Sequence, residues 1–263
     1  MIRLDRKHAV KPLDWEPRVE AAFADFAEFV REAERFEKLP LSSTERRAGF
    51  ARFAPKALRR KSGTGKAAFP DVWGTAKDEI SKMSHGKCAY CEGGINAKRS
   101  CQVEHFRPKS LFPAKAYRWE NYVLACGGCN GPKRDKWPEK GGYLRPDRGD
   151  PSRSLCFRED GSVSAVAGRR DAARTVVDFE LDREALRIWR GQWIRRALTV
   201  VGHCAKLYRA GLHGMALEFA RSYFEPICHP QSEYSAAISE CFLRAWDREC
   251  PGVRLPGRRR RFF

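Results

Sequence analysis

Hydrophobic residues between positions 15 and 38 recur at spacings of three and four. This period places them on one face of a helix, and Pro17 is tolerated in a first helical turn. The pattern therefore predicts an amphipathic helix over residues 15–38. The recurring residues are Trp15, Val19, Phe23, Phe26, Val30 and Ala33.

The chain after residue 150 is also predicted to be mostly helical. Asp182 is a suitable N-cap for a long helix that follows it, and further helices are expected near residues 212–224 and 232–247. A short helix is predicted over residues 71–82. The long helix would share one apolar face made of Leu186, Trp189, Trp193, Ala197, Val200, Cys204 and Tyr208.

Residues 87–150 differ from both flanks, because they are rich in Gly, Pro and Cys and show little helical period. We therefore predict an N-terminal helical region over residues 1–86, a central functional segment over 87–150 and a C-terminal helical region over 151–263. The fold class expected from this pattern is α+β, mainly α.

The formal net charge is +18 over 263 residues, and the three regions carry +5, +6 and +7 in chain order. A charge spread in this way favours a polyanionic partner, of which nucleic acid is the commonest. A basic protein without such a partner remains open. The first residues lack the apolar run of a signal peptide, and no stretch has the roughly 20 apolar residues of a membrane span. We expect a cytoplasmic protein with no membrane partner.

Two C-x-x-C pairs lie 34 residues apart, Cys88/Cys91 and Cys126/Cys129. Four thiolates with this spacing suit a closed tetrahedral zinc site, which has no open position and is therefore structural. A redox pair and four buried thiols are the alternatives. The other cysteines are expected to be buried, and Cys101 lies near the proposed site without an assigned role.

An acid and an imidazole stand side by side between the two pairs, at Glu104 and His105. Asn121 follows, and Asn130 comes directly after the last cysteine. In this order and within residues 86–137, the chain resembles the HNH endonuclease superfamily, in the variant whose ββα-metal core is clamped by two C-x-x-C zinc knuckles. The resemblance implies this core, with helical regions on either side.

A closer resemblance is to the HNH nucleases found with retrons and in Septu-type antiphage systems, the PtuB-like family. It extends loosely over much of residues 1–190. The similar segments are Met1-Ile2-Arg3, Tyr90-Cys91-Glu92, V-E-H-F-R-P-K-S from Val103, Tyr117 to Asn121, Ala172 to Thr175 and Leu181-Asp182-Arg183.

The resemblance implies a role for each residue of the motif. His105 is the expected general base, and Asn121 braces the loop that holds it. Glu104 and Asn130 are expected to bind a catalytic Mg²⁺ or Mn²⁺. Both side chains of the Glu104–His105 pair can serve one site only if their strand ends or twists there. The expected phosphate contacts are Arg107, Lys109, Lys133 and Arg134.

The expected activity is hydrolysis of nucleic-acid phosphodiester bonds, with DNA favoured over RNA. Glu replaces the more frequent Asp, and Asn replaces a final His, so the metal preference is open. The alternative is a non-catalytic zinc module that binds nucleic acid. The segment Ser62 to Ala67 lacks the Gly and the Ser or Thr of a phosphate-binding loop. The resemblance implies a separate ATPase subunit as partner, with or without a retron DNA–RNA element.

Overall fold

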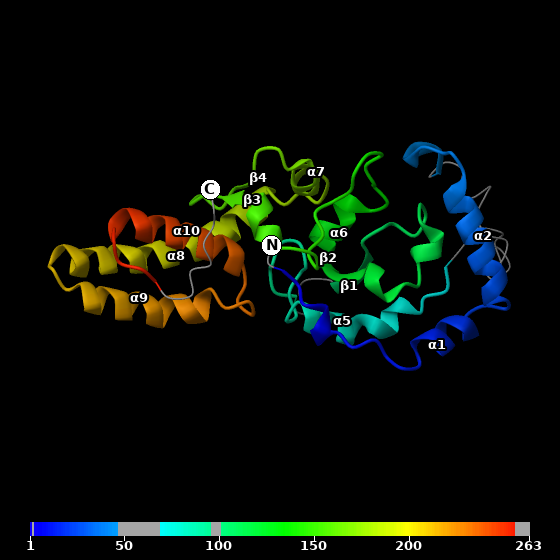
Figure 1. Ribbon diagram of the computed structural model, residues 1–263, viewed down its shortest axis with the longest axis horizontal. Helices are drawn as coiled ribbons and strands as arrows, with labels where there is room; N and C mark the ends of the chain where they lie inside the picture. Colours follow the sequence, from blue (N-terminus) through cyan, green and yellow to red (C-terminus); the bar gives the residue numbers. More distant parts are fainter. Residues whose placement is uncertain (2, 47–68, 96–100, 256–263) are drawn as a thin grey trace. The chain divides into compact units, whose positions relative to one another are not determined.

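The computed structural model describes residues 1, 3–46, 69–95 and 101–255 (Figure 1). Its chain divides into two compact units. The N-terminal unit contains Asp5–Cys88 and Ile95–Tyr143, and the C-terminal unit contains Met1–Leu4, Ala89–Gly94 and Leu144–Phe263. The N-terminal helices and most of the central segment thus share a unit, while the boundaries at residues 86 and 150 stay a prediction. The segment from Ser62 to Ala67 lies outside the described residues.

The N-terminal unit begins with a 3-10 turn, η1 (Arg6–His8), and two helices, α1 (Trp15–Ala21) and α2 (Phe26–Lys38). The prediction of one continuous helix over 15–38 was therefore wrong. Asp25 has extended backbone, and its carboxylate accepts a hydrogen bond of 2.8 Å from the amide of Glu28. Asp25 thus caps a new helix, and the buried face of α2 is formed by Phe29, Ala33 and Phe36, whereas Phe26 and Val30 of the predicted face are only half-buried.

The buried face of α1 and α2 supports residues 113–117, which include the 3-10 turn η3 (Pro113–Lys115). The indole Nε1 of Trp15 donates to the carbonyl oxygen of Tyr117 over 3.1 Å. The amide of Ala114 donates to the carboxylate of Glu37 over 2.8 Å. Phe29 is almost completely buried, and its ring centre lies 5.8 Å from that of Tyr117. The apolar face of α1 and α2 is thus buried against other residues of the N-terminal unit.

The centre of the N-terminal unit is a two-stranded antiparallel sheet followed by a short helix. β1 (Cys101–His105) pairs with β2 (Tyr122–Cys126), with Cys101 opposite Cys126 and His105 opposite Tyr122. α6 (Gly127–Lys133) follows β2 directly. The order β1, β2, α6 agrees with the predicted ββα core. The structure also describes η2 (Trp73–Ala76), α5 (Lys77–Met83) and η4 (Trp119–Asn121) in this unit.

The described residues of the C-terminal unit form a hairpin and four helices, and α8 packs against both α9 and α10 (Figure 1). The helices after residue 210 agree with the prediction. The N-cap of α8 is Arg183, and Asp182 instead accepts a 2.7 Å hydrogen bond from the amide of Val163. The hairpin was not predicted. The elements are η5 (Pro151–Ser154), β3 (Leu155–Phe157), β4 (Val163–Ala165), α7 (Arg170–Asp178), α8 (Glu184–Arg209), α9 (His213–Ile227) and α10 (Ser235–Glu249).

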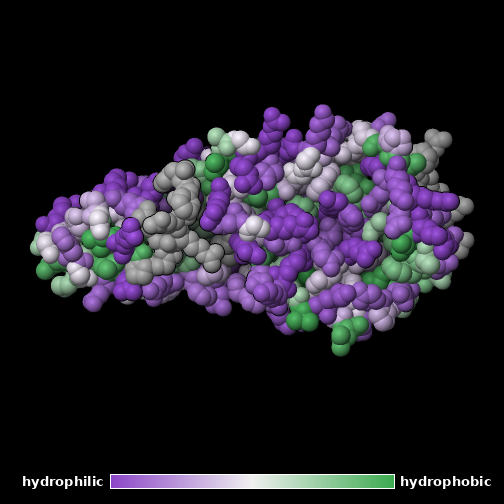
Figure 2. Space-filling view, viewed as in Figure 1, coloured by the Kyte–Doolittle hydropathy of each residue, from purple (hydrophilic) through white to green (hydrophobic). Residues whose placement is uncertain are grey.

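Hydrophilic residues cover most of the face shown in Figure 2, with small separate groups of hydrophobic residues among them. Within the described part of the chain, every helix is too short or too polar to cross a membrane. Several apolar side chains of the C-terminal unit are nonetheless exposed. On α9 these are Met215 and Phe219, which are 57% and 45% exposed and lie four residues apart.

Candidate functional site

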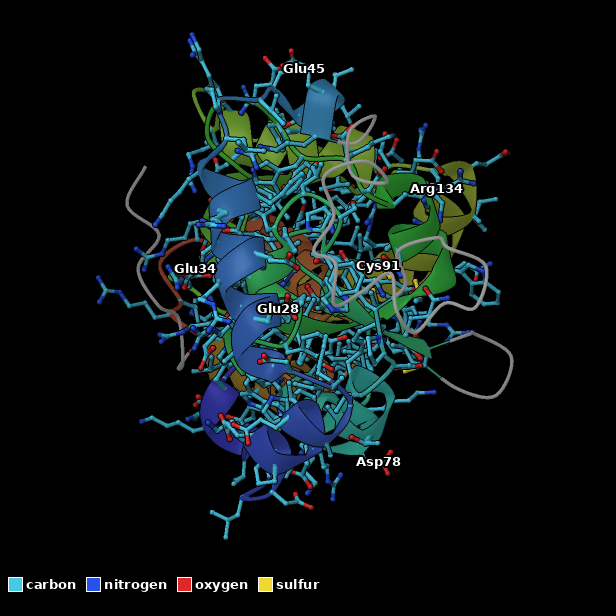
Figure 3. The ribbon with its side chains drawn as sticks, turned by 90° about the vertical axis from the view of Figure 1, so that its right-hand side faces the viewer. Glu28, Glu34, Glu45, Asp78, Cys91 and Arg134 are labelled. Atoms are coloured by element: carbon cyan, nitrogen blue, oxygen red, sulfur yellow. The ribbon has the colours of Figure 1, made fainter. Side chains whose placement is uncertain are left out.

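The four cysteines of the two C-x-x-C pairs form one buried cluster. Their sulfur atoms all lie within 4.8 Å of one another. In a tetrahedral zinc site with Zn–S bonds of about 2.3 Å, the sulfurs are roughly 3.8 Å apart, so the cluster fits zinc with little adjustment. Cys126 ends β2 and Cys129 lies in the first turn of α6, while Cys91 is labelled in Figure 3. The clustering predicted from sequence is confirmed.

His105 ends β1, and its imidazole is held in one orientation. Its Nε2 lies 2.9 Å from the carbonyl oxygen of Ala116, which also accepts a 2.6 Å hydrogen bond from the hydroxyl of Tyr122. Because a carbonyl oxygen only accepts, Nε2 carries the hydrogen and Nδ1 carries the lone pair. The rings of Trp73 and Tyr122 stand edge-on to the imidazole, at centroid distances of 4.7 and 5.1 Å.

Burial, together with the positive charges of Lys109 and Lys133, lowers the pKa of His105 to about 3. The hydrogen bond to Ala116 acts in the opposite direction. The imidazole is therefore neutral at pH 7, which is the state that can accept a proton.

Glu104 points to the opposite face of β1, where it contacts Lys133 of α6. The ammonium of Lys133 donates to the Glu104 carboxylate and, over 2.8 Å, to the carbonyl oxygen of His105. Both side chains are almost fully buried. Burial raises the pKa of Glu104, and Lys133 opposes this rise. The sequence predicted a phosphate contact for Lys133, but here its ammonium faces Glu104 and the end of β1.

Asn121 joins the two ends of the loop between β1 and β2. Its Oδ1 accepts a 2.8 Å hydrogen bond from the amide of Arg107, and its Nδ2 donates to the carbonyl oxygens of Arg107 and Lys115, each over 3.0 Å. The side chain is 4% exposed. It therefore ties the residues just after His105 to those just before Ala116.

A cleft of about 640 Å³ runs along β1 and is bordered by consecutive strand residues from both faces. β1 ends at His105, which allows Glu104 and His105 to border one cleft from opposite faces. The cleft brings together Glu104, His105, Lys109, Asn130 and Arg134. Asn121, Arg107 and Lys133 are not among the residues that line it.

Trp73 and Gln102 are among the cleft residues that sequence reasoning missed. The ammonium of Lys109 lies 3.6 Å from the centre of the Trp73 ring. Burial lowers the pKa of Lys109 to about 8, and the carboxylates of Asp71 and Glu104 oppose this change. Gln102 accepts a 2.5 Å hydrogen bond from Nδ2 of Asn130. This bond turns the side-chain oxygen of Asn130 away from Gln102. Alternation along β1 could have placed Gln102 beside Glu104, but nothing in the sequence connects Trp73 with His105.

Arg134 follows the end of α6, where Figure 3 labels it. Its backbone has φ 46° and ψ −116°, a conformation that side chains other than glycine rarely adopt. Its amide donates to the carbonyl oxygen of Asn130 over 2.8 Å. The turn places an exposed guanidinium at the border of the cleft.

Residues 88–136 match the family model described as HNH endonuclease. The matched range covers both cysteine pairs, β1, β2 and α6, which are the parts that form the zinc cluster and the cleft. The chain therefore carries an HNH endonuclease domain.

Two curated relatives share similarity beyond this motif. The chain is 28% identical to the Septu protein PtuB of Bacillus mycoides, over 43% of this chain and 48% of that protein. It is 33% identical to the Septu protein PtuB of Bacillus thuringiensis, over 32% of this chain and 34% of that protein. The chain thus spans half or less of the length of these relatives. The resemblance to PtuB-like HNH proteins inferred from the residues is confirmed.

These residues offer two kinds of candidate metal site, a cluster of four cysteines and a pair of oxygen ligands in the cleft. Among the residues that the structure describes, the four cysteines are the only group of three or more Cys, His, Asp or Glu ligands close enough for one ion. Glu104 and Asn130 offer two oxygen ligands, and Mg²⁺ usually completes such a shell with water and substrate oxygens. The cleft therefore fits a hard cation. The Glu104 carboxylate would then contact both the cation and the ammonium of Lys133.

Proposed function

We propose that this chain is a metal-dependent HNH endonuclease that hydrolyses phosphodiester bonds in nucleic acid. The observation that carries the proposal is the environment of His105. Its Nε2 is fixed on Ala116, its Nδ1 carries the lone pair, and it borders a cleft that also contains Glu104, Asn130 and two basic side chains. A neutral, oriented imidazole beside oxygen ligands and cations is what hydrolysis of a phosphodiester requires.

In the proposed mechanism, Nδ1 of His105 takes a proton from water as the water oxygen attacks phosphorus. The new P–O bond forms and the bond to the ester oxygen breaks, and that oxygen takes up a proton. A pKa of about 3 makes the isolated imidazole a weak base. Entry of a phosphodiester anion favours the imidazolium form and raises this pKa toward the working pH.

The other residues position and neutralise the substrate. A divalent cation at Glu104 and Asn130 would stabilise the charge on the phosphate and on the leaving oxygen. Asn121 holds the loop that carries Arg107 and ends near Ala116, so it keeps the base in place. Lys109 and Arg134, which border the cleft, are proposed to contact the phosphates, with Arg107 beside them.

DNA is the favoured substrate, on the basis of the HNH resemblance. The test is to incubate purified protein with plasmid DNA and with total RNA, each with Mg²⁺, with Mn²⁺ and with a chelator. We expect cleavage with a divalent cation and none with the chelator. Absence of cleavage of both substrates under every condition would contradict the proposal.

A non-catalytic zinc module that binds nucleic acid is the second candidate. The observation that favours it is the Lys133–Glu104 ion pair, which occupies the carboxylate proposed to bind the catalytic cation. Binding of DNA and RNA without cleavage under any metal condition would select this function. Binding with cation-dependent cleavage would exclude it.

We further propose that the protein acts in the cytoplasm as the nuclease effector of an antiphage defence system, restrained by a separate ATPase subunit. The similarity to the Septu proteins PtuB supports this proposal. So does the charge of +18, since attraction to nucleic acid is largely independent of sequence and an unrestrained nuclease would attack host nucleic acid. A retron DNA–RNA element is a further candidate component.

The surface proposed for this partner is the exposed apolar part of α9, at Met215 and Phe219. The apolar face of α2 is a less suitable surface, because it packs against residues 113–117 within its own unit. Co-expression with neighbouring genes followed by affinity purification tests the proposal. We expect Met215→Glu with Phe219→Glu to lose the copurified ATPase. Recovery of the nuclease alone, equally active with and without its neighbours, would contradict it.

A further inference from the structure

Cys101 lies beside the zinc cluster without belonging to it. It starts β1 directly opposite Cys126, the last residue of β2 and one of the four clustered cysteines. Partners in an antiparallel register point to the same face of a sheet. The side chain of Cys101 therefore lies on the face from which Cys126 joins the cluster. The structure has each of the ten cysteines as a thiol rather than in a disulfide.

The hydrogen-bond pattern fixes the kind of pair that the two cysteines form. The amide of Phe106 donates to the carbonyl oxygen of Asn121, so the pair Phe106–Asn121 is of the hydrogen-bonded kind. Hydrogen-bonded and non-hydrogen-bonded pairs alternate along an antiparallel ladder. Cys101–Cys126, five positions further, is therefore a non-hydrogen-bonded pair. His105–Tyr122 lies four positions from Cys101–Cys126, so it is also a non-hydrogen-bonded pair, and its ring centres are 5.1 Å apart.

Partners in a non-hydrogen-bonded pair have Cα atoms about 4.5 Å apart and side chains close together. Disulfides span Cα separations of about 4.4–6.8 Å. The sheet thus holds Cys101 and Cys126 at a separation that a disulfide can bridge with the strands in place. Cys101 is half-buried, so a small oxidant can reach this corner of the sheet.

We propose that Cys101 is the resolving thiol of a redox switch that removes Cys126 from the zinc site when the protein meets a peroxide. The sulfur of Cys126 attacks hydrogen peroxide, an S–O bond forms as the O–O bond breaks, and a sulfenic acid and one water result. The sulfur of Cys101 then attacks the sulfenic sulfur, the S–S bond forms, the S–O bond breaks, and a second water leaves. The two thiols lose two electrons in total, and the peroxide gains them.

Cys101 is better placed for the second step than Cys88, Cys91 and Cys129, the three cysteines that share the cluster with Cys126. Those three serve as metal ligands in the proposed zinc site, so each would have to leave the ion before attacking sulfur. Cys101 has no such role and is held opposite Cys126 by the strand register. Loss of Cys126 leaves three thiolates, which weakens zinc binding. It also loosens the start of α6, the helix that carries Asn130 and Lys133. Thiol reductants would reverse the change.

The test treats the zinc-loaded full-length protein with hydrogen peroxide. Released zinc is followed with a chromogenic chelator, and the disulfide is identified by peptide mass spectrometry. The wild type should release zinc together with a Cys101–Cys126 disulfide, and reductant with added zinc should restore it. Cys101→Ser should slow zinc release by about tenfold or more, because a held thiol reacts far faster than one in solution. Cys156→Ser, at another half-buried strand cysteine, should behave as the wild type.

These measurements do not depend on nuclease activity, so their failure and the failure of the proposed function are distinguishable. Equal rates of zinc release from the wild type and from Cys101→Ser would overturn the proposal. A first disulfide that excludes Cys101, such as one between Cys126 and Cys129, would overturn it as well.

Discussion

The imidazole of His105 donates from Nε2 to the carbonyl oxygen of Ala116, and this contact connects the candidate base to the N-terminal helices. Ala116 precedes Tyr117, whose carbonyl oxygen accepts the indole hydrogen of Trp15. The amphipathic helices are therefore part of the apparatus that orients His105. A nuclease segment cut at residue 86 would lack this support.

Replacement of His105 by glutamine should remove cleavage and leave the zinc cluster intact. Glutamine can still donate a hydrogen bond toward Ala116, but it has no basic nitrogen. Loss of a positioned general base typically lowers the rate by about 10²- to 10⁴-fold. Cleavage rate, zinc content and nucleic-acid affinity should be measured on the same preparation. His105→Ala should also lower the melting temperature, because the ring packs between Trp73 and Tyr122.

His203→Gln provides the matched control, since His203 is an exposed histidine of α8 in the C-terminal unit. It should cleave at the wild-type rate. Wild-type cleavage by His105→Gln would show that the proposed base is wrong.

Asn130→Ala should raise the concentration of Mg²⁺ or Mn²⁺ needed for half-maximal cleavage, because it removes one of two proposed protein oxygen ligands. Gln102→Ala is the variant to compare with it. It removes the acceptor of the Asn130 Nδ2 hydrogen bond while keeping the ligand, so it should have a smaller effect in the same direction. An unchanged metal titration for Asn130→Ala would exclude Asn130 as a ligand.

Nucleic-acid affinity should fall as the pH rises through the region near 8, because Lys109 loses its charge there. Its free-state pKa is lowered to about 8, whereas a bound phosphate favours the charged ammonium and raises that pKa. Binding therefore takes up a proton above pH 8. The affinity should decrease with rising pH by at most about tenfold per pH unit for this one group.

The measurement is a titration of a fluorescent oligonucleotide at pH 7, 8 and 9 and constant ionic strength. Lys109→Met should bind more weakly at pH 7 and show less pH dependence than the wild type. Lys206→Met, at an exposed lysine of α8, should keep the wild-type pH dependence. The same pH dependence in wild type and Lys109→Met would refute this assignment.

The parts of the site that sequence could predict are those determined by short-range spacing. The two C-x-x-C pairs predicted the cysteine cluster, because each pair is a local turn and tetrahedral zinc accepts four thiolates. The Glu104–His105 dipeptide predicted two side chains at one strand end. The apolar period predicted the helices of the C-terminal region. It could not predict the first residue of α8, because the carboxylate of Asp182 accepts a hydrogen bond from the amide of Val163 instead of capping the helix.

The parts that could not be predicted depend on contacts between distant residues. Lys133 is 29 positions from Glu104, and only the packing of α6 on β1 turns a surface lysine into a buried counter-ion. Trp73 contacts His105 from 32 positions earlier in the chain. The hairpin of β3 and β4 was missed because strands of three residues, Leu155–Phe157 and Val163–Ala165, are too short to show a clear alternation.

Purified protein should contain about one tightly bound zinc per chain. Cys88→Ser or Cys126→Ser should lose the zinc and aggregate or unfold, because each change removes a buried ligand and the binding free energy of structural zinc is also folding free energy. Zinc content by elemental analysis and circular dichroism of the same samples give the two readouts. Soluble, fully folded protein without zinc would contradict the assignment of the cysteine cluster.

The final prediction separates the backbone of Arg134 from its charge. The residue has φ 46° and ψ −116°, and such a conformation costs a non-glycine residue on the order of 1–3 kcal/mol. Glycine adopts positive φ without this cost. Arg134→Gly should therefore be more stable than Arg134→Ala by about 1 kcal/mol, although glycine is also more flexible in the unfolded chain. Both variants lose the guanidinium, so both should bind nucleic acid more weakly and to the same extent. Chemical denaturation and oligonucleotide titration on the pair test the two effects. An alanine variant as stable as the glycine variant would show that the turn at Arg134 carries no strain, and unequal affinities would show that the turn itself shapes the cleft.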